Sequence, residues 1–212
     1  MATYEINTDI LSTAEGDELI RRLRIGDSVY LTGKAFTCRS RLHRWVFDEE
    51  HPLPQTVRDR RLLIHVGPIV VKEDGQWRLV SFMPNSSIRF EKWGARSVRE
   101  WGLKVIVGKT TMGKETAEAM AECGCVHLSP RSVSPNLWVE HIKIEDVDLF
   151  DELGTIEATW RLNVDRLGPF VVDIDTTGSK LFDALDQIIE QNRRAAFEKI
   201  GIPDGFEYTK LY

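Results

Sequence analysis

The chain has 212 residues, of which 42% are hydrophobic, so it can bury the core of one globular domain. Its formal net charge of −5 comes from 28 basic and 33 acidic residues, and this acidic balance excludes nucleic acid as a general partner, because phosphate binding needs a basic surface. No apolar run approaches the length that spans a bilayer, and the N-terminal residues lack the blocks of a signal peptide, so we expect a cytoplasmic protein that does not associate with membranes.

The first part of the chain is predicted to alternate helix and strand. Ser12–Glu15 is typical of a capping box, and the apolar residues after it repeat at helical spacing. A strand is predicted over Ser28–Leu31, closed by Thr32-Gly33. A helix then passes through His43, which shares a helix face with Arg39 if the helix has begun by that point. By composition this segment is an ordinary basic surface turn.

Strand signals follow in the next part of the chain. Leu62–Val66 is an apolar run that ends at Gly67-Pro68, as expected of a strand and its turn. Apolar segments on both sides of Asp74-Gly75 predict a β-hairpin, because this dipeptide suits the tight turn between paired strands.

Polar residues precede the next predicted helix. Asn85, Ser86 and Ser87 come just before an apolar-periodic segment, which is typical of helix capping. The alternative is a helix N-terminus rich in hydroxyl and amide groups with Arg89 in its first turn. Such a site suits a carboxylate, because arginine can bind one through two parallel hydrogen bonds.

The stretch Val105–Gly124 predicts a strand, a glycine loop and a helix. This order points backbone N–H groups and a helix N-terminus at one spot, which attracts anions, and Lys109 adds a positive charge there. Gly108–Lys114 fits the phosphate-loop pattern except at its last position, where Glu115 replaces the hydroxyl that holds magnesium. An ordinary strand-to-helix turn, a general anion site and a nucleotide site are all compatible with this loop.

The C-terminal part is predicted to contain two strands and a long helix. Thr159–Val164 and Phe170–Ile174 are the strands, joined through Leu167–Pro169, and Asp173 weakly resembles a magnesium-binding aspartate at a strand end. Apolar residues from Leu181 onward repeat at helical spacing until Gly201. This amphipathic helix would pack on the core, or alternatively on a partner subunit.

The three cysteines do not suggest a disulfide framework or a metal site. Cys123 and Cys125 are separated by one residue rather than two, which excludes a zinc knuckle or a redox dithiol. Together with Cys38 they do not have iron–sulfur spacing. The ligands of any cluster associated with this chain would therefore lie on another chain.

Several short motifs follow one another in a fixed order along the chain. They are Leu23–Asp27, Tyr30–Gly33, Thr37–Arg39, His43-Arg44, Gly67–Val70, Val107–Lys109, Met112-Gly113, Asp151–Gly154, Trp160, Gly168-Pro169 and Ile174–Thr176. Each motif alone is weak, but their order and gaps resemble the β subunit of the iron–sulfur tartrate dehydratases and the similar C-terminal domain of the class I (iron–sulfur) fumarases. The resemblance covers roughly Leu23 to Leu181.

The resemblance implies an α/β fold, a swivelling β/β/α sandwich, docked on an α subunit. The α subunit would supply the cysteines of a four-iron four-sulfur cluster that acts as a Lewis acid on the substrate hydroxyl. By the same resemblance Arg39, Arg89 and Lys109 bind the carboxylates of the substrate. Thr32 and His43, which lie in matching motifs, complete the substrate-binding set.

The chain departs from the family pattern at the residues expected to transfer the proton. The family usually has G-P-T-T-S-x-R-M where this chain has Met83–Phe90, so the catalytic threonine falls at Asn85. An amide has no useful acid–base chemistry near neutral pH, and Ser86 would replace the threonine only if a base activates it. Threonines also stand at two positions of the lysine loop Gly108–Met112 where the family has glycines, and Arg39 is followed by Ser40 instead of aspartate. These departures suggest an altered substrate or a reduced activity.

We therefore predict one domain over residues 1–212, with a core of about 23–181 and helical extensions at both ends. Its expected function is the β subunit of a two-component hydro-lyase for a small 2-hydroxydicarboxylate, in a homodimer or α2β2 assembly with the cluster-bearing subunit. A non-catalytic or altered-specificity paralogue is the alternative that Asn85 favours. A nucleotide-binding protein is a third, favoured by Gly113-Lys114 and opposed by Glu115.

Overall fold

The computed structural model describes residues 1–131, 134–203 and 205–206. They fall into two compact units, Met1–Lys180 and the part that begins at Leu181. The first unit has a mixed α/β fold, as predicted, and it carries all the predicted site residues. No helix in the described part of the chain is both long enough and apolar enough to cross a bilayer.

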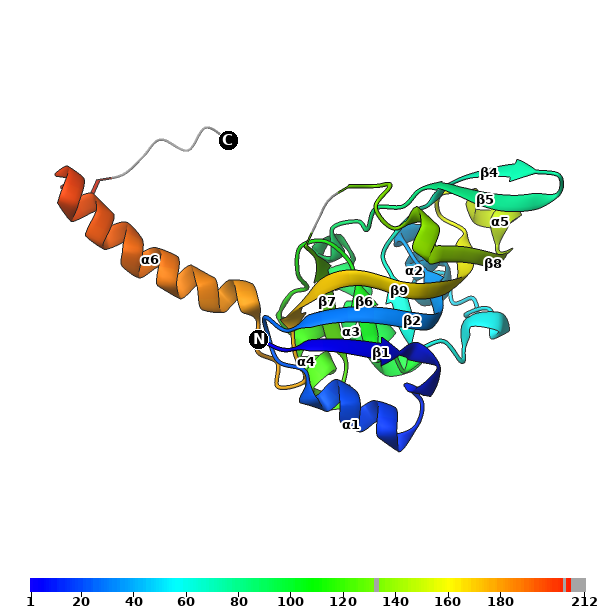
Figure 1. The fold of residues 1–212 in the computed structure, drawn as a ribbon, viewed down its shortest axis with the longest axis horizontal. Coiled ribbons are helices and arrows are strands. Elements are labelled where there is room, and N and C mark those ends of the chain that lie inside the picture. The colour runs from blue at the N-terminus through cyan, green and yellow to red at the C-terminus, as the bar shows by residue number, and fades with distance from the viewer. Residues whose placement is uncertain (132–133, 204, 207–212) are drawn as a thin grey trace. The chain divides into compact units, whose positions relative to one another are not determined.

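The first unit is organised around a seven-stranded sheet (Figure 1). Its strands, in spatial order, are β1 (Thr3–Asn7), β2 (Ser28–Thr37), β3 (Leu62–Ile64), β6 (Val105–Val107), β7 (Val126–Pro130), β9 (Thr159–Ile174) and β8 (Ile142–Asp148). The strands from β1 to β7 in this order run parallel, whereas β9 is antiparallel to its neighbours. Because β9 pairs with both β7 and β2, the strands β2, β3, β6, β7 and β9 close into a ring. The hairpin predicted at Asp74-Gly75 is confirmed as β4 (Ile69–Glu73) and β5 (Gln76–Ser81).

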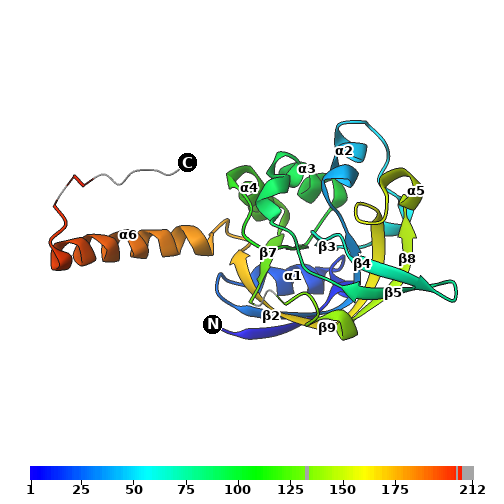
Figure 2. The same ribbon diagram turned by 90° about the horizontal axis from the view of Figure 1, so that it is seen from above.

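Two hydrophobic cores lie on opposite faces of the central parallel strands. In β6, Val105 and Val107 face one core and Ile106 faces the other, because side chains alternate along a strand. The first core lies between these strands and residues of β2 and β9. The second core lies under α2 (Ser40–Phe47), α3 (Glu91–Trp101) and α4 (Lys114–Cys123). Figure 2 shows these three helices together on one side of the strands.

The remaining helices of the first unit are short or peripheral. They are α1 (Ala14–Arg22), α5 (Phe150–Leu153) and the 3-10 turns η1 (Thr8–Ile10), η2 (Gln55–Val57), η3 (Ser87–Phe90) and η4 (Val139–His141). The predicted capping box is displaced by one residue. Thr13 is the N-cap of α1, and its hydroxyl accepts a hydrogen bond from the amide of Gly16 at 3.2 Å. A glycine at that third position has no side chain to complete the box.

The prediction that Thr32-Gly33 closes a strand is wrong, since β2 continues to Thr37. The pairing of β2 with β9 shifts register between Leu31 and Gly33, so the break is a bulge inside the strand. Gly33 has a φ of +116°, and a Cβ there would lie 2.6 Å from the hydroxyl oxygen of Thr8. Glycine is therefore required here by a close tertiary contact, and it does not end the strand.

The two C-terminal strands predicted on either side of Gly168-Pro169 are one continuous strand, β9. Val29 and Leu31 of β2 pair with Phe170 and Leu167, so β9 has one extra residue across this interval. Gly168 and Pro169 therefore lie in a bulge within β9, and pairing with the neighbouring strands continues on both sides of it. Local sequence cannot reveal this pairing.

The second unit contains the predicted amphipathic helix, α6 (Leu181–Ile200), which Gly201 follows with a φ of +74°. None of the residues of α6 is buried. Packing of this helix on the core or on a partner stays a prediction.

Candidate active site

Two predicted site residues and His65 lie at one edge of the sheet. Arg39 follows the end of β2, His65 follows β3, and Lys109 lies two residues beyond the end of β6. Because these strands are parallel, their carboxyl ends meet at the same edge. In α/β folds with parallel strands, both barrels and open sheets, ligands bind at the carboxyl ends of the strands. The topology thus brings together residues that are far apart in the sequence.

Backbone hydrogen bonds join the Asn85–Ser87 segment to this edge. The amide of Asn85 donates to the His65 carbonyl at 2.6 Å, and the Lys109 amide donates to the Asn85 carbonyl at 2.9 Å. The Ser87 amide in turn donates to the Lys109 carbonyl at 2.9 Å, and Ser86 and Lys109 form a parallel bridge. Asn85, Ser86 and Lys109 are therefore neighbours, as the predicted site requires.

Arg89 and Asn85 present groups that are available to a ligand. Arg89 lies in η3, and its side chain is exposed. The Asn85 Oδ1 atom is buried and has no hydrogen-bond partner among the described residues. A buried acceptor without a donor is costly, so Asn85 is suited to accept a hydrogen bond from a bound molecule.

Arg39 is held by a carboxylate of the same chain. Its Nε lies 3.3 Å from Oε1 of Glu157, and both side chains are about one-fifth exposed, at 21% and 19%. The other oxygen of Glu157 accepts the Arg41 amide at 2.9 Å. A Cβ on Gly67 would lie 2.7 Å from Arg39 Nη1, so the guanidinium rests against the backbone that follows β3. Arg39 thus lies at the same edge of the sheet with its charge partly balanced, while its buried Nε has no hydrogen-bond partner among the described residues.

His43 lies in the core and not on a surface turn. Its ring stacks between Trp93 and Trp101, each at 5.4 Å between ring centroids, and Nδ1 is 3.4 Å from Cys38 Sγ. Burial lowers the pKa of His43 to about 3, so the imidazole is neutral. With no exposed surface, His43 lies behind the protein surface and cannot contact a bound ligand directly.

Thr32 is not brought to the site. It lies within β2, five residues before the strand ends at Thr37, which corresponds to about 16 Å along a strand. Its hydroxyl accepts the backbone amide of Arg166 on β9 at 3.0 Å.

The N-terminus of α4 already holds an anion, the carboxylate of Glu91. Glu91 accepts the amide of Gly113 at 2.6 Å, the amide of Thr116 at 3.2 Å and the hydroxyl of Thr116 at 2.8 Å. These are the first-turn donors that a phosphate would need. Lys114 points away, with its amine 3.8 Å from Glu118 and 89% of its side chain exposed. The geometry therefore opposes a phosphate loop.

A buried network that the sequence analysis missed lies behind the Asn85–Ser87 segment. We call it the His127 network, and its members are His65, Ser87, His127, Ser129 and Asp173. His127 bonds to Asp173 Oδ1 through Nδ1 at 2.6 Å and to Ser87 Oγ through Nε2 at 2.8 Å. His65 Nδ1 lies 2.9 Å from the same Ser87 Oγ, and Ser129 Oγ lies 2.5 Å from Asp173 Oδ2. Both carboxylate oxygens of Asp173 are therefore bonded to His127 and Ser129, which opposes the magnesium-binding role that its position at a strand end resembled.

One signal in the sequence could have indicated this network. His127 and Ser129 are two residues apart in the otherwise apolar strand β7, and a spacing of two places both on one face. No local pattern indicates that Asp173, 46 residues after His127, is their partner.

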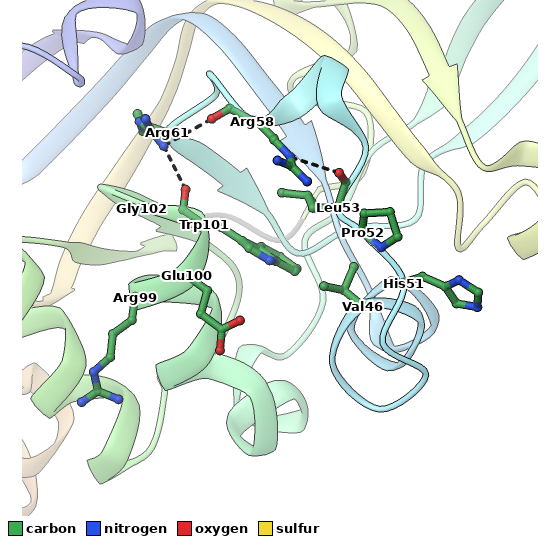
Figure 3. A pocket seen from close by; sticks show the side chains of 10 residues that line it. All are labelled: Val46, His51, Pro52, Leu53, Arg58, Arg61, Arg99, Glu100, Trp101 and Gly102. Carbon is green, nitrogen blue, oxygen red and sulfur yellow. Dashed lines mark hydrogen bonds between the residues drawn. The ribbon is translucent and has the colours of Figure 1, made fainter.

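A surface pocket of about 510 Å³ lies elsewhere, between α2 and α3 (Figure 3). Within it, Arg58 donates to the Leu53 carbonyl at 3.3 Å and Arg61 donates to the Trp101 carbonyl at 2.9 Å. None of the predicted site residues lines this pocket. It does not contribute to the candidate site.

The cysteines of this chain do not form a cluster-binding set. Cys38 and Cys125 are buried, and burial raises the pKa of both thiols, which disfavours the thiolate that binds iron. In the part of the chain that the structure describes, no three histidine, cysteine or acidic side chains group into a possible metal site.

Comparisons with known proteins identify the family of this chain. A family model described as Fumarase C-terminus matches residues 3–185. The chain is 32% identical over 192 residues to the L(+)-tartrate dehydratase subunit beta of Escherichia coli (strain K12), covering 90% of this chain and 94% of the relative. It is 30% identical over 172 residues to the putative L(+)-tartrate dehydratase subunit beta of Methanocaldococcus jannaschii, covering 79% and 88%. A putative fumarate hydratase class I of Geobacillus stearothermophilus is 31% identical over 173 residues, which are 81% of this chain and 33% of that longer protein. The chain therefore belongs to the Fumarase C-terminus family.

Proposed function

We propose that this chain is the β subunit of a two-component hydro-lyase acting on a small 2-hydroxydicarboxylate of the tartrate or malate/fumarate type. One observation carries the proposal. In a chain that matches a tartrate dehydratase β subunit over 90% of its length, Arg39, Lys109 and the Asn85–Arg89 segment converge at the carboxyl ends of parallel strands.

The proposed substrate has two carboxylates, and dehydration requires both to be fixed so that the C–OH and C–H bonds are correctly placed. Arg89 is exposed and can bind one carboxylate through two parallel hydrogen bonds. Lys109 supplies a second cation from the neighbouring segment. Arg39 contributes a third charge, which Glu157 partly offsets until an anion arrives. His43 supports this arrangement from the core.

Ser86 and Asn85 are the groups that we assign to the reacting carbon. The Ser86 hydroxyl would hold the proton that the substrate loses, and it needs a base to remove its own proton first. Asn85 cannot transfer a proton, but its buried and unpaired Oδ1 is suited to accept a hydrogen bond from the substrate. Thr32 has no direct role in this proposal, because it lies within β2 and away from the other residues.

The proposal also includes an α subunit that carries an iron–sulfur cluster. A four-iron four-sulfur cluster on an α subunit, when bound, supplies Lewis-acid chemistry at the substrate hydroxyl. The two cores on opposite faces of the parallel strands support the assignment to a swivelling β/β/α sandwich. Such a domain would dock on the α subunit in a cytoplasmic homodimer or α2β2 assembly.

A non-catalytic or altered-specificity paralogue is the second candidate, and Asn85 is the observation that favours it. The site would then keep its anion-binding groups without the threonine that transfers the proton in the family.

Arg89→Lys tests the proposal in the complex with the α subunit. Losing the paired contact should weaken substrate binding by roughly 1.5–3 kcal/mol, or about one to two decades in affinity. Arg22→Lys is the matched control, because Arg22 lies on α1 in an exposed ion pair with Glu18. The assay is turnover of malate, tartrate and fumarate. If both variants have wild-type KM values the site is misplaced, and if the wild-type complex turns over none of these acids the non-catalytic alternative is favoured.

A further inference from the structure

We infer that the His127 network is a positioning device for the candidate site, which sets the lysine loop Gly108–Met112 against the Asn85–Arg89 segment. Its kinetic consequences rest on the proposed function, whereas its effect on the loops does not.

The network touches both segments that carry predicted substrate residues. Ser87 follows Asn85 and Ser86 directly, and its side chain bonds to His127. At the other end, Ser129 Oγ lies 2.5 Å from the carbonyl oxygen of Thr110, the residue after Lys109. β7 supplies His127 and Ser129, and β9 supplies Asp173. Strands at the centre of the sheet therefore hold both segments through side chains.

The network does not act as a nucleophile, although Ser87, His127 and Asp173 have the order of a hydrolytic triad. Ser87 has no exposed surface. The backbone of Gly108 covers it so closely that a Cβ on Gly108 would lie 1.9 Å from Ser87 Oγ. A substrate cannot reach this hydroxyl, so the contacts can only fix the positions of the groups around it.

The shape of the lysine loop needs such support. Thr110 has a φ of +64°, in the left-handed region that a β-branched residue rarely adopts. Backbone strain of this kind persists only where surrounding contacts impose it. The Ser129 hydroxyl is the side-chain group that contacts the Thr110 carbonyl, so it is the contact best placed to hold the loop and Lys109.

Ser129→Ala removes this contact together with the contact to Asp173 Oδ2, and it leaves the bonds of His127 to Asp173 and Ser87 in place. The loop should then populate other conformations, and the apparent affinity should fall with the fraction of loops in the binding conformation. One neutral hydrogen bond corresponds to about a three- to tenfold change. We expect KM to rise by that factor with little change in kcat, because Lys109 holds the carboxylate equally before and during the reaction.

Ser97→Ala is the matched control. Ser97 is equally buried, at 1% exposure against 5% for Ser129, and its hydroxyl also donates to a backbone carbonyl, that of Trp93 at 2.9 Å. It lies on α3, outside the network. Ser129→Thr keeps the hydroxyl on a residue type suited to a strand, and it should restore wild-type behaviour.

Two measurements test the inference. Hydrogen exchange of the full chain, read by mass spectrometry, reports on peptides containing Lys109–Met112 and Asn85–Phe90 without any substrate. Steady-state kinetics of the complex with the α subunit then report KM and kcat separately.

The inference holds if Ser129→Ala speeds exchange in the lysine loop and raises KM while Ser97→Ala does neither and Ser129→Thr reverses both. It is overturned if the two alanine variants exchange equally in that loop, since the network would then be only structural. If wild type turns over no hydroxydicarboxylate and Ser129→Ala still speeds exchange, the positioning role stands and the proposed function fails.

Discussion

Glu91→Ala should destabilise the protein by about 2 kcal/mol. The substitution removes the carboxylate that caps α4, where it accepts the amides of Gly113 and Thr116 and the Thr116 hydroxyl. Loss of an N-cap acceptor costs about 0.5–2 kcal/mol, and loss of a negative charge at a helix N-terminus costs about 0.3–1 kcal/mol more. Glu91 is half-buried, so water can replace part of the lost hydrogen bonding to the helix donors. We therefore take the middle of the summed range of about 0.8–3 kcal/mol.

Thermal unfolding followed by circular dichroism measures this effect. For a chain of this length about 2 kcal/mol corresponds to a fall in Tm of about 4–8 °C. Glu115→Ala is the matched control, because Glu115 is exposed in the same first turn of α4. It removes the same charge but no backbone acceptor, so its Tm should fall by no more than about 4 °C.

The same variant tests the anion site. With the carboxylate gone, inorganic phosphate can bond to the amides of Gly113 and Thr116, and a ligand that binds only the folded state raises the Tm. Phosphate should therefore raise the Tm of Glu91→Ala by more than it raises the Tm of the wild type or of Glu115→Ala, because all three keep the cations of the candidate site. Equal Tm values for Glu91→Ala and Glu115→Ala without phosphate would refute the capping argument, and an equal rise for the wild type and Glu91→Ala in phosphate would refute the claim that Glu91 occupies the terminus.

Two further predictions concern the pH dependence of stability and the residues that transfer the substrate proton. Burial lowers the pKa of His43 to about 3, so below about pH 6.5 the unfolded chain binds a proton that the folded chain does not, and stability falls by up to about 1.4 kcal/mol per pH unit. His43→Phe should reduce this loss between pH 7 and pH 4 in urea denaturation, and an unchanged slope would mean that the imidazole is protonated in the folded state. In the active complex, Ser86→Ala should lower kcat with little change in KM, whereas Asn85→Thr should preserve or raise turnover of malate or tartrate. A loss of turnover in Asn85→Thr together with a harmless Ser86→Ala would mean that the reaction needs the Asn85 amide and that Ser86 takes no part in it.

Local signals in the sequence were sufficient for several elements. The helix end at Gly124 was predicted because only glycine adopts a left-handed conformation without strain, and Gly124 has a φ of +65°. The signals for the hairpin at Asp74-Gly75 and for the buried strand β6 were equally local. The turn dipeptide and the three β-branched residues Val105–Val107 each act within a few residues. The residues of the candidate site were predicted from the order of short motifs that resembles the family. The topology of the sheet then placed Arg39, Lys109 and Asn85 at one edge.

The tertiary structure alone decided which polar groups are satisfied and which are free. The sequence presented the start of α4 as an anion site, but Glu91, 22 residues before Gly113, occupies its donors. His43 reads as a surface histidine next to arginines, yet Trp93 and Trp101 enclose it from another helix. His127 and Asp173 meet only because β7 and β9 are paired. Periodicity and propensity describe a residue and its close neighbours, whereas hydrogen-bond partners and burial depend on segments that come together only when the chain folds.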